Sequence, residues 1–369
     1  MSNKIRLAVV GLGKMGLSHH AMINAHPGVK VAAVCDSTGY VLDVLNKYTG
    51  VKTYTDFDAM LREVELDAII VATPSSMHAA MVKASLEKGL HVFCEKPFCL
   101  DTNDGEEVTR IAEEKGLVSQ VGYHYRFVGA FQEVKRLLEA KAIGEVTHVQ
   151  AEAYGPVVLK PKGSTWRTQR SQGGGCLYDY AAHPLNLVNW YLGMPNAVGG
   201  SVLNSIFSQE TDDEVFGTLY YEGGQSAQIS VNWSDESYRK MSTKISICGT
   251  NGRNYADRQE CQVYLRDAPE TLSNYQKGWN VRYTTDLTEP VWFYLRGEEY
   301  SAQLDYFVKC IEQRDARGNV NSFANAVETD RVISMMIADA ERGPSMASGA
   351  AAPVVARQKK GWLASLFGG

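Results

Sequence analysis

The stretch Gly11-Leu-Gly13-Lys-Met-Gly16 decides the fold of this chain. It fits the pattern G-x-G-x-x-G, and it joins a strand-like apolar run, Leu7–Val10, to a helix-like segment over 16–26. Glycine is required there because the backbone must approach a pyrophosphate closely, while the helix N-terminus offers free N–H groups and the positive end of its dipole. Asp36 ends the next strand-like run, at the distance of about 20 residues that the dinucleotide-binding fingerprint requires.

The acid at position 36 indicates which dinucleotide fits. A carboxylate accepts hydrogen bonds from the adenosine ribose hydroxyls and repels a 2′-phosphate, and Ser37 and Thr38 supply no cation to offset that repulsion. The sequence therefore predicts NAD as the cofactor, with NADP disfavoured. The alternative is a glycine-rich turn in an unrelated α/β protein, with Asp36 as a surface acid. The residues expected at the dinucleotide from this pattern are Gly11, Gly13, Lys14, Met15, Gly16, Asp36 and Ser37.

The first third of the chain alternates short apolar runs with helix-like segments. Runs that are apolar on both faces and are separated by helices indicate a parallel sheet with helices on both sides. The expected strands are 7–10, 31–34, 68–72, 91–94 and 118–121, and the expected helices are 16–26, 39–48, 77–88 and 103–115.

From about residue 145 the pattern changes to longer, half-polar strands. In Ala227–Trp233 apolar and polar residues alternate strictly, which indicates one buried and one wet face. Gly223-Gly224 and Asn251-Gly252 suggest hairpin turns. The fold class is therefore predicted as α/β: an N-terminal Rossmann domain plus a C-terminal α+β domain with a large, mostly antiparallel open sheet. Further helices are expected near 129–140, 180–192, 298–313 and 323–341, and the expected divisions are 1–124, 125–343 and a linker and tail over 344–369.

Composition excludes several classes of protein. The 369 residues carry 42 acidic and 37 basic side chains, and this net charge of −5 disfavours a general nucleic-acid binder. Seven cysteines occur without a C-x-x-C pair, so neither a disulfide framework nor a zinc or other metal site is expected. A strand-like run follows Met1–Arg6 without a signal peptide, and no apolar run reaches the roughly 20 residues of a membrane span. We expect a soluble cytoplasmic protein.

Two stretches carry the chemistry of a candidate catalytic site. Lys96 follows the strand-like run His91–Cys94, and ligands of such sheets bind at the carboxyl ends of the strands. Asp179 and His183 follow three consecutive glycines and are four residues apart, so in a helix they share one face. A carboxylate that orients a histidine is a common acid/base arrangement. Taken singly, each has a structural alternative: a surface lysine, a helix-capping aspartate and a core histidine.

Together these motifs resemble the Gfo/Idh/MocA family of oxidoreductases, which includes glucose–fructose oxidoreductase and inositol dehydrogenases. The resemblance covers about residues 4–343, and it departs from the family pattern at Ala181, where glycine is frequent, and at Asn186, where aspartate is frequent. The motifs that carry it, besides the glycine loop, are Thr73-Pro-Ser-Ser-Met-His78, Glu95-Lys96-Pro97, Trp166-Arg167, Gly173 to His183 and Ser322 to Ile333.

The resemblance implies a role for each matched residue. Lys96 would contact the cofactor ribose and the reacting hydroxyl, His183 would accept the proton in oxidation, and Asp179 would fix the histidine and bind a substrate hydroxyl. It also implies a cis bond before Pro97. It adds Thr73, Pro74, His78, Glu95 and Lys96 to the cofactor site. The expected substrate-binding residues are Lys96, Tyr125, Arg126, Trp166, Arg167, Asp179 and His183.

The function predicted from these features is hydride transfer between NAD and a secondary alcohol or ketone carbon of a sugar, sugar derivative or cyclic polyol. Two alternatives stay open: a glycosidase or lyase that oxidises a sugar carbon transiently, and a dinucleotide-binding sensor without catalysis. The resemblance further implies a homodimer or homotetramer formed through the C-terminal sheet.

Overall fold

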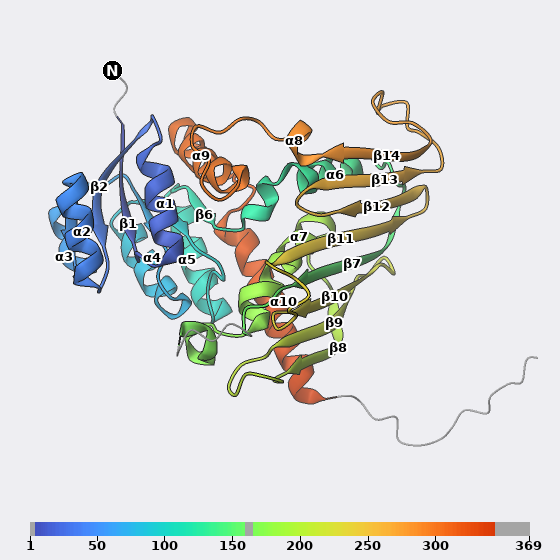
Figure 1. Cartoon of the computed structure of the whole chain (residues 1–369), viewed down its shortest axis with the longest axis horizontal. Helices are drawn as coiled ribbons and strands as arrows, with labels where there is room; N and C mark the ends of the chain where they lie inside the picture. The colour runs from blue at the N-terminus through green and yellow to red at the C-terminus, as the bar shows by residue number, and fades with distance from the viewer. Residues whose placement is uncertain (1–3, 159–164, 344–369) are drawn as a thin grey trace, which may run out of the picture.

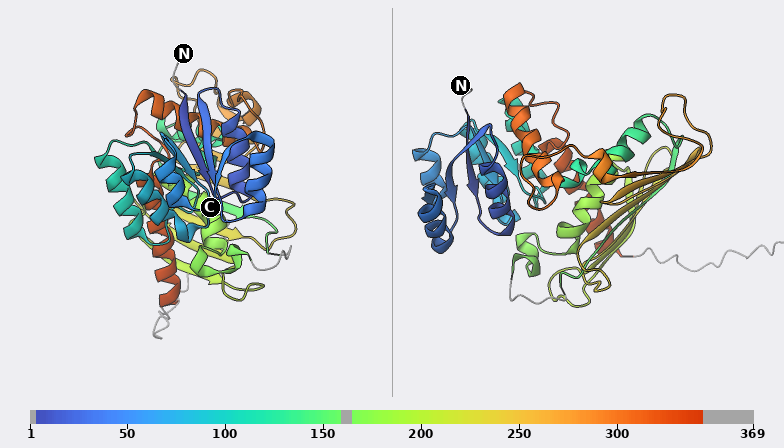
Figure 2. Two further views of the ribbon diagram at one scale, coloured as in Figure 1. Left: turned by 90° about the vertical axis from the view of Figure 1, so that its left-hand side faces the viewer. Right: turned by 45° about the horizontal axis from the view of Figure 1, so that its top comes forward.

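The computed structural model describes residues 4–158 and 165–343, and the predicted tail over 344–369 lies outside these residues. Two sheets lie at opposite ends of the molecule, with helices between them (Figures 1 and 2). The fold class is the predicted one, a parallel α/β part and a part built on a larger, mostly antiparallel sheet.

The first sheet has six parallel strands in the order β3-β2-β1-β4-β5-β6, so the order reverses between β1 and β4. Every strand predicted for it is present. Strand β3 and helix α3 escape prediction because elements this short show no periodicity. The strands are β1 Ile5–Val10, β2 Val29–Cys35, β3 Lys52–Tyr54, β4 Ala68–Val71, β5 His91–Cys94 and β6 Ser119–Val121, and the helices are α1 Lys14–Asn24, α2 Gly39–Thr49, α3 Phe57–Glu63, α4 His78–Glu87 and α5 Thr102–Glu114.

The second sheet has eight strands in the order β14-β13-β12-β11-β7-β10-β9-β8. Neighbouring strands are antiparallel except β7 and β10, which run parallel. The two predicted hairpins are present, because β9 pairs with β10 and β11 pairs with β12. The strands are β7 Val146–Tyr154, β8 Ala197–Asn204, β9 Glu214–Tyr220, β10 Ser226–Asn232, β11 Ser242–Gly249, β12 Gly252–Ala256, β13 Glu260–Leu265 and β14 Gly278–Tyr283.

Helices cover one face of the second sheet. Helices α6 (Gly129–Glu139), α7 (Ala182–Leu192) and α10 (Phe323–Arg342) pack on it, and alternate residues are buried in the strands other than the two at the edges, β8 and β14. Helix α9 (Glu298–Gln313) instead returns to the first sheet, where its apolar residues join the core of β1 and β2. Short elements complete the chain: η1 Ser75–Met77, η2 His124–Phe127, η3 Trp166–Thr168, η4 Arg170–Gln172, a π-helical turn at Leu177–Ala181 and α8 Thr284–Leu287.

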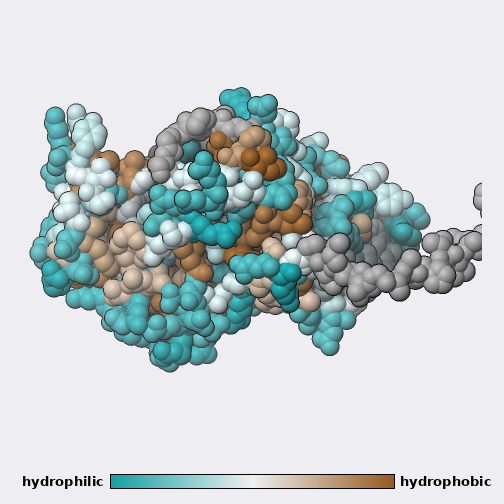
Figure 3. Space-filling view, turned by 90° about the horizontal axis from the view of Figure 1, so that it is seen from below, coloured by the Kyte–Doolittle hydropathy of each residue, from teal (hydrophilic) through white to brown (hydrophobic). Residues whose placement is uncertain are grey.

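The surface seen from below is mostly hydrophilic and is interrupted by small hydrophobic patches (Figure 3). Among the described residues, no helix combines the length and the apolar character that crossing a membrane requires.

Candidate active site

The glycine loop lies where the strand order reverses, between the ends of β1 and β4. Gly11 has φ +83°, and a Cβ there would lie 2.7 Å from backbone atoms of Ala72 and Thr73. A Cβ at Gly16 would lie 1.7 Å from the carbonyl oxygen of Gly11. At Gly13 a Cβ would meet nothing within 4 Å. The outer glycines therefore permit close packing of the chain, and the middle one faces open space.

Asp36 is held in place at the end of β2. Its carboxylate accepts the N–H of Leu12 at 2.5 Å and that of Thr38 at 2.7 Å. Gly13 is the N-cap of α1, and the N-terminus of a helix favours an anionic group through its N–H donors and dipole. The other residues predicted here are more open: Lys14, Ser37 and Pro74 are exposed, and Met15 and Thr73 are half-buried. This cradle fits a dinucleotide.

Lys96 occupies the carboxyl end of β5, as predicted, and the Lys96–Pro97 bond is cis. Its ammonium donates to the carboxylate of Asp179 at 2.7 Å and to the Asp179 carbonyl oxygen at 2.9 Å. The other carboxylate oxygen accepts Nε of Arg167 at 2.8 Å, and Arg167 stacks on Trp166 with Cζ 4.5 Å from the ring centroid. Burial raises the pKa of Asp179, but Lys96 and Arg167 outweigh it and lower that pKa to about 2.

The structure corrects the expected pairing of Asp179 with His183. Asp179 lies in the π-helical turn Leu177–Ala181, just before α7, and Nδ1 of His183 has no hydrogen-bond partner among the described residues. Both carboxylate oxygens are bound by Lys96 and Arg167. The Asp179 carboxylate therefore engages the lysine, and no hydrogen bond joins it to Nδ1 of His183.

His183 is buried, with 4% of its surface exposed, and its Nδ1 has no hydrogen-bond partner among the described residues. The rings of His124 and Tyr125 each lie 5.0 Å from it, centroid to centroid. Burial and the positive charges of Lys96 and Arg258 lower the pKa of His183 well below its ordinary value. The imidazole is therefore neutral and able to accept a proton at neutral pH.

Glu95, which was predicted to contact the cofactor, is engaged by hydrogen bonds within the protein. Its carboxylate pairs with Nε2 of His19 at 2.6 Å and accepts the N–H of Lys96 at 3.1 Å. Burial opposes ionisation of Glu95, but His19 outweighs it and lowers the Glu95 pKa. This link between α1 and the Lys96 loop was missed, since no local pattern joins residues 76 positions apart.

His78, another residue predicted at the cofactor, is also engaged by contacts within the protein. It is 1% exposed. Its Nε2 lies 2.9 Å from the carbonyl oxygen of Thr73, and its Nδ1 lies 3.0 Å from that of Pro97 and 3.1 Å from that of Phe98. The imidazole therefore links the loops that follow β4 and β5.

Arg126 does not reach the pocket, which corrects its predicted role in substrate binding. Its guanidinium is buried between α7 and α10, where it donates to the side-chain oxygens of Asn186 and Asn325, each at 2.8 Å. Asn186 in turn donates to Thr329 at 3.0 Å. Burial lowers the pKa of Arg126 to about 10. The departure from the family pattern at Asn186 therefore belongs to a packing network.

Four residues near His183 were not predicted. Tyr300 of α9 stacks on His124 at 4.3 Å, and the guanidinium of Arg296 lies 5.1 Å from the Tyr300 ring centroid. Arg258, on the turn between β12 and β13, forms an ion pair with Glu299. They come from segments far apart in the chain, and no motif in the sequence marks them.

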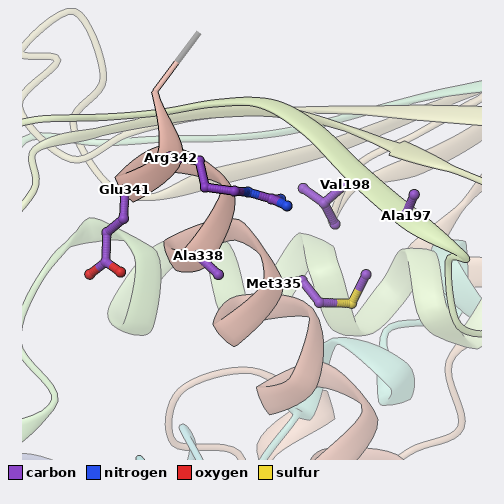
Figure 4. A pocket seen from close by; sticks show the side chains of 6 residues that line it. All are labelled: Ala197, Val198, Met335, Ala338, Glu341 and Arg342. Carbon is purple, nitrogen blue, oxygen red and sulfur yellow. The ribbon is translucent and has the colours of Figure 1, made fainter. Parts of the chain in front are cut away.

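A shallow cavity of about 590 Å³ lies elsewhere, between the end of α10 and β8 (Figure 4). It is lined by Ala197, Val198, Met335, Ala338, Glu341 and Arg342, none of which was predicted as a site residue. Within residues 4–158 and 165–343, no cluster of three or more His, Cys, Asp or Glu is arranged to hold a metal ion.

Comparison with known proteins places both halves of the chain in one family. Residues 5–123 match the model of the GFO/IDH/MocA oxidoreductase family, NAD-binding Rossmann fold. Residues 131–254 match the C-terminal domain of the same family.

Individual relatives are distant but extensive. The chain is 29% identical over 282 residues to the 2,7-anhydro-N-acetylneuraminate hydratase of Escherichia coli (strain K12), covering 72% of this chain and 71% of the relative. It is 26% identical over 257 residues to the scyllo-inositol 2-dehydrogenase (NAD(+)) of Bacillus subtilis (strain 168), covering 68% and 73%. A levoglucosan dehydrogenase in complex with NADH and levoglucosan has the same fold, with a TM-score of 0.80 at 20% identity over 92% of this chain and 98% of that one.

Proposed function

Because the chain belongs to the GFO/IDH/MocA oxidoreductase family, we propose that it is an NAD-dependent dehydrogenase acting on a secondary alcohol of a sugar, sugar derivative or cyclic polyol. The observation that carries the proposal is the arrangement of Lys96 and His183. The lysine stands at the carboxyl end of β5, held by Asp179, and its charge acts on a buried, neutral histidine. A cofactor ribose and a hydroxyl-bearing carbon fit beside such a pair.

The loop Gly11–Gly16 and the N-terminus of α1 would hold the pyrophosphate, and Asp36 would bind the adenosine ribose hydroxyls. Each Asp36 oxygen has a lone pair left after its backbone contact. The same carboxylate repels a 2′-phosphate, which favours NAD over NADP. When bound, the nicotinamide supplies the hydride acceptor.

In this proposal His183 removes the hydroxyl proton, because it is neutral and no hydrogen bond occupies its Nδ1. Lys96 binds the substrate oxygen and stabilises the negative charge that develops on it. Asp179 holds the ammonium in place through its carboxylate and its backbone carbonyl. Burial of His183 and its aromatic neighbours keeps water away from the proton acceptor.

The test is NADH formation by the purified protein with NAD and a panel of sugars and polyols. General base catalysis typically contributes about 10²–10⁴-fold, so His183→Ala should lower kcat by a factor in that range while NADH binding is retained. His148→Ala, on β7 with its ring bonded to Ser226, is the matched control and should keep full activity. Near-normal turnover of His183→Ala would move the base to Lys96.

A second candidate is an elimination or hydration with transient oxidation of one sugar carbon. The hydratase among the relatives favours it. In that reaction the hydride taken up in oxidation returns to the substrate, so no net NADH accumulates. Incubation with NAD and a deuterated substrate separates the two: net NADH formation supports the dehydrogenase, and product formation without NADH supports the second candidate.

The outer face of the second sheet supports an oligomer. The strands β13 and β14 expose Tyr264, Trp279, Val281 and Tyr283 on this face. The ring centroids of Tyr264 and Trp279 lie 5.4 Å apart. We propose that this face packs against its copy in a dimer or tetramer, because clustered exposed apolar groups mark interaction sites. Light scattering should give a multiple of 40.7 kDa, and a monomer at micromolar concentration would refute the proposal.

The compartment and the domain division also stand as proposals. The seven cysteines are free thiols and six of them are buried, which supports the reducing cytoplasm. The division at residue 124 follows the end of the first sheet, although α9 returns to it. Limited proteolysis with mass spectrometry should show whether cleavage occurs near that position.

A further inference from the structure

A second group of charged side chains lies near His183 and His124, apart from the Asp179 pair. Arg258 comes from the β12–β13 turn, and Arg296 precedes helix α9. We call these two residues the arginine pair. A row of rings joins it to the site: His124 lies 5.0 Å from His183, Tyr300 stacks on His124 at 4.3 Å, and Arg296 lies 5.1 Å from the Tyr300 centroid.

Arg296 forms no ion pair with a carboxylate among the described residues, 4–158 and 165–343. Its Nε is buried without a hydrogen-bond partner in that part of the chain. The remaining segments, 1–3, 159–164 and 344–369, contain neither Asp nor Glu. Desolvating a donor without satisfying it costs free energy. A ligand that accepts from Arg296 would remove that cost.

Arg258 is only partly neutralised. It pairs with Glu299, which is buried, but its own side chain is 40% exposed. Its positive charge lowers the pKa of both His183 and His124, after the larger effect of their burial, so it lies near the reacting groups. Glu299 is the one carboxylate paired with it, among the described residues, so it leaves guanidinium donors available.

Cations outnumber carboxylates around His183, His124 and Asp179, which also favours an anionic ligand. The cations that act on the two histidines or on Asp179 are Lys96, Arg167, Arg258 and Arg296. The carboxylates are Asp179 and Glu299 at the pocket, with Glu95 turned back to His19. A positive excess beside a cleft that would also hold a cationic nicotinamide favours an anionic substrate.

We propose that Arg258 and Arg296 bind an anionic group, a carboxylate or a phosphate, on the sugar substrate. This inference rests on the proposed dehydrogenase function and specifies its substrate class as sugar acids or sugar phosphates. Guanidinium groups match both anions, because their planar donors form paired hydrogen bonds with two oxygens. Neutral polyols would leave the arginine pair without an acceptor.

The experiment compares substrates that share a ring and differ in charge: glucose, glucuronate and glucose 6-phosphate, with the corresponding galactose series. NADH formation gives kcat/KM, and fluorescence gives the Kd of NADH. We expect an anionic member to exceed its neutral partner at least tenfold, since hydrogen bonds to charged groups are strong. The leading anion identifies the group, carboxylate or phosphate.

The variants Arg296→Met and Arg258→Met should each lower kcat/KM for that anion by roughly 10- to 100-fold, with little change for the neutral sugar. Arg296→Lys should restore part of the loss because it keeps the charge. Arg282→Met is the matched control, since Arg282 also stacks on a tyrosine, at 5.3 Å from Tyr275, and it should not change the ratio.

Three outcomes overturn the inference. Neutral sugars that equal or exceed their anionic partners would refute it and leave the dehydrogenase in place. A higher Kd for NADH in Arg296→Met would show that the arginine pair binds the cofactor phosphates. Absence of binding and turnover for every sugar, with NADH still bound, would instead refute the proposed function and this inference with it.

Discussion

Replacement of Asp179 by Asn tests the carboxylate that organises the site. The change keeps the size of the side chain and one acceptor oxygen but removes the charge that faces Lys96 at 2.7 Å and Arg167 at 2.8 Å. The Arg167 side chain is 41% exposed, so solvent screens its ion pair with Asp179. The Lys96 pair is 14% and 6% exposed and dominates the effect. A charge-assisted hydrogen bond contributes roughly 1.5–3 kcal/mol, which predicts a loss of roughly 10- to 150-fold in kcat/KM.

The assay is steady-state NADH formation with the best substrate of the panel. NADH binding and thermal unfolding serve as checks that the variant folds. Asp267→Asn is the matched control, because it removes an exposed pair with Lys277 at 3.4 Å and should leave kcat/KM unchanged. If Asp179→Asn stays folded and keeps kcat/KM within about threefold of the unaltered protein, the carboxylate does not position Lys96 for the reaction, and the reasoning fails.

Three further predictions follow from single features of the structure. Gly16→Ala should weaken NADH binding at least about tenfold, because its Cβ would lie 1.7 Å from the Gly11 carbonyl oxygen. A Cβ at Gly39 would meet nothing within 4 Å, so the control variant Gly39→Ala should bind NADH normally. Equal Kd values for the two variants would contradict this prediction. His183 has a pKa well below 6.5, so kcat/KM should stay level as pH falls to about 6.5 and decline only below it; a His183-dependent midpoint at or above 6.5 would contradict this. Burial raises the pKa of Asp330 from 3.8 to about 8, so between these pH values the folded state keeps a proton that the unfolded state loses. The free energy of unfolding should therefore fall as pH rises from 3.8 to about 8, by at most about 1.4 kcal/mol per pH unit. Asp330→Asn should lack that slope in urea unfolding at several pH values, and parallel curves for the two proteins would contradict it.

Local sequence patterns predicted most of the strands and helices of the fold. The glycine loop, the acid after β2 and the lysine after β5 each depend on a few neighbouring residues, and the structure places them at the strand ends where such patterns predict them. Helix periodicity located α6, α7, α9 and α10 within a few residues. Strand β3 and helix α3 are held by packing against their neighbours and have no periodic pattern long enough to recognise.

The site was less predictable because its contacts join distant segments. The i, i+4 spacing of Asp179 and His183 predicted that the two side chains would pair, but the Asp179 carboxylate is engaged by Lys96 and Arg167, 83 and 12 positions away. The contact of His19 with Glu95 spans 76 positions, and that of Arg258 with Glu299 spans 41. Neither pair has a sequence signature. Arg126 follows a strand of the first sheet, as a ligand-binding residue would, but the amides of Asn186 and Asn325 hold it in the core.

Charge links the proposed base to the proposed substrate class. His183 gains a positive charge when it accepts a proton, yet the groups whose charges act on it are the cations Lys96 and Arg258. Asp179, which was predicted to fix the histidine, is engaged by Lys96 and Arg167. An anionic group on the substrate, bound by the arginine pair, would offset these cations at the moment when the histidine becomes charged. The negative group would therefore raise kcat as well as improve binding. Removal of the Arg296 side chain should lower kcat and raise KM for the anionic sugar. A change in KM alone would mean that the anion anchors the substrate without assisting proton transfer.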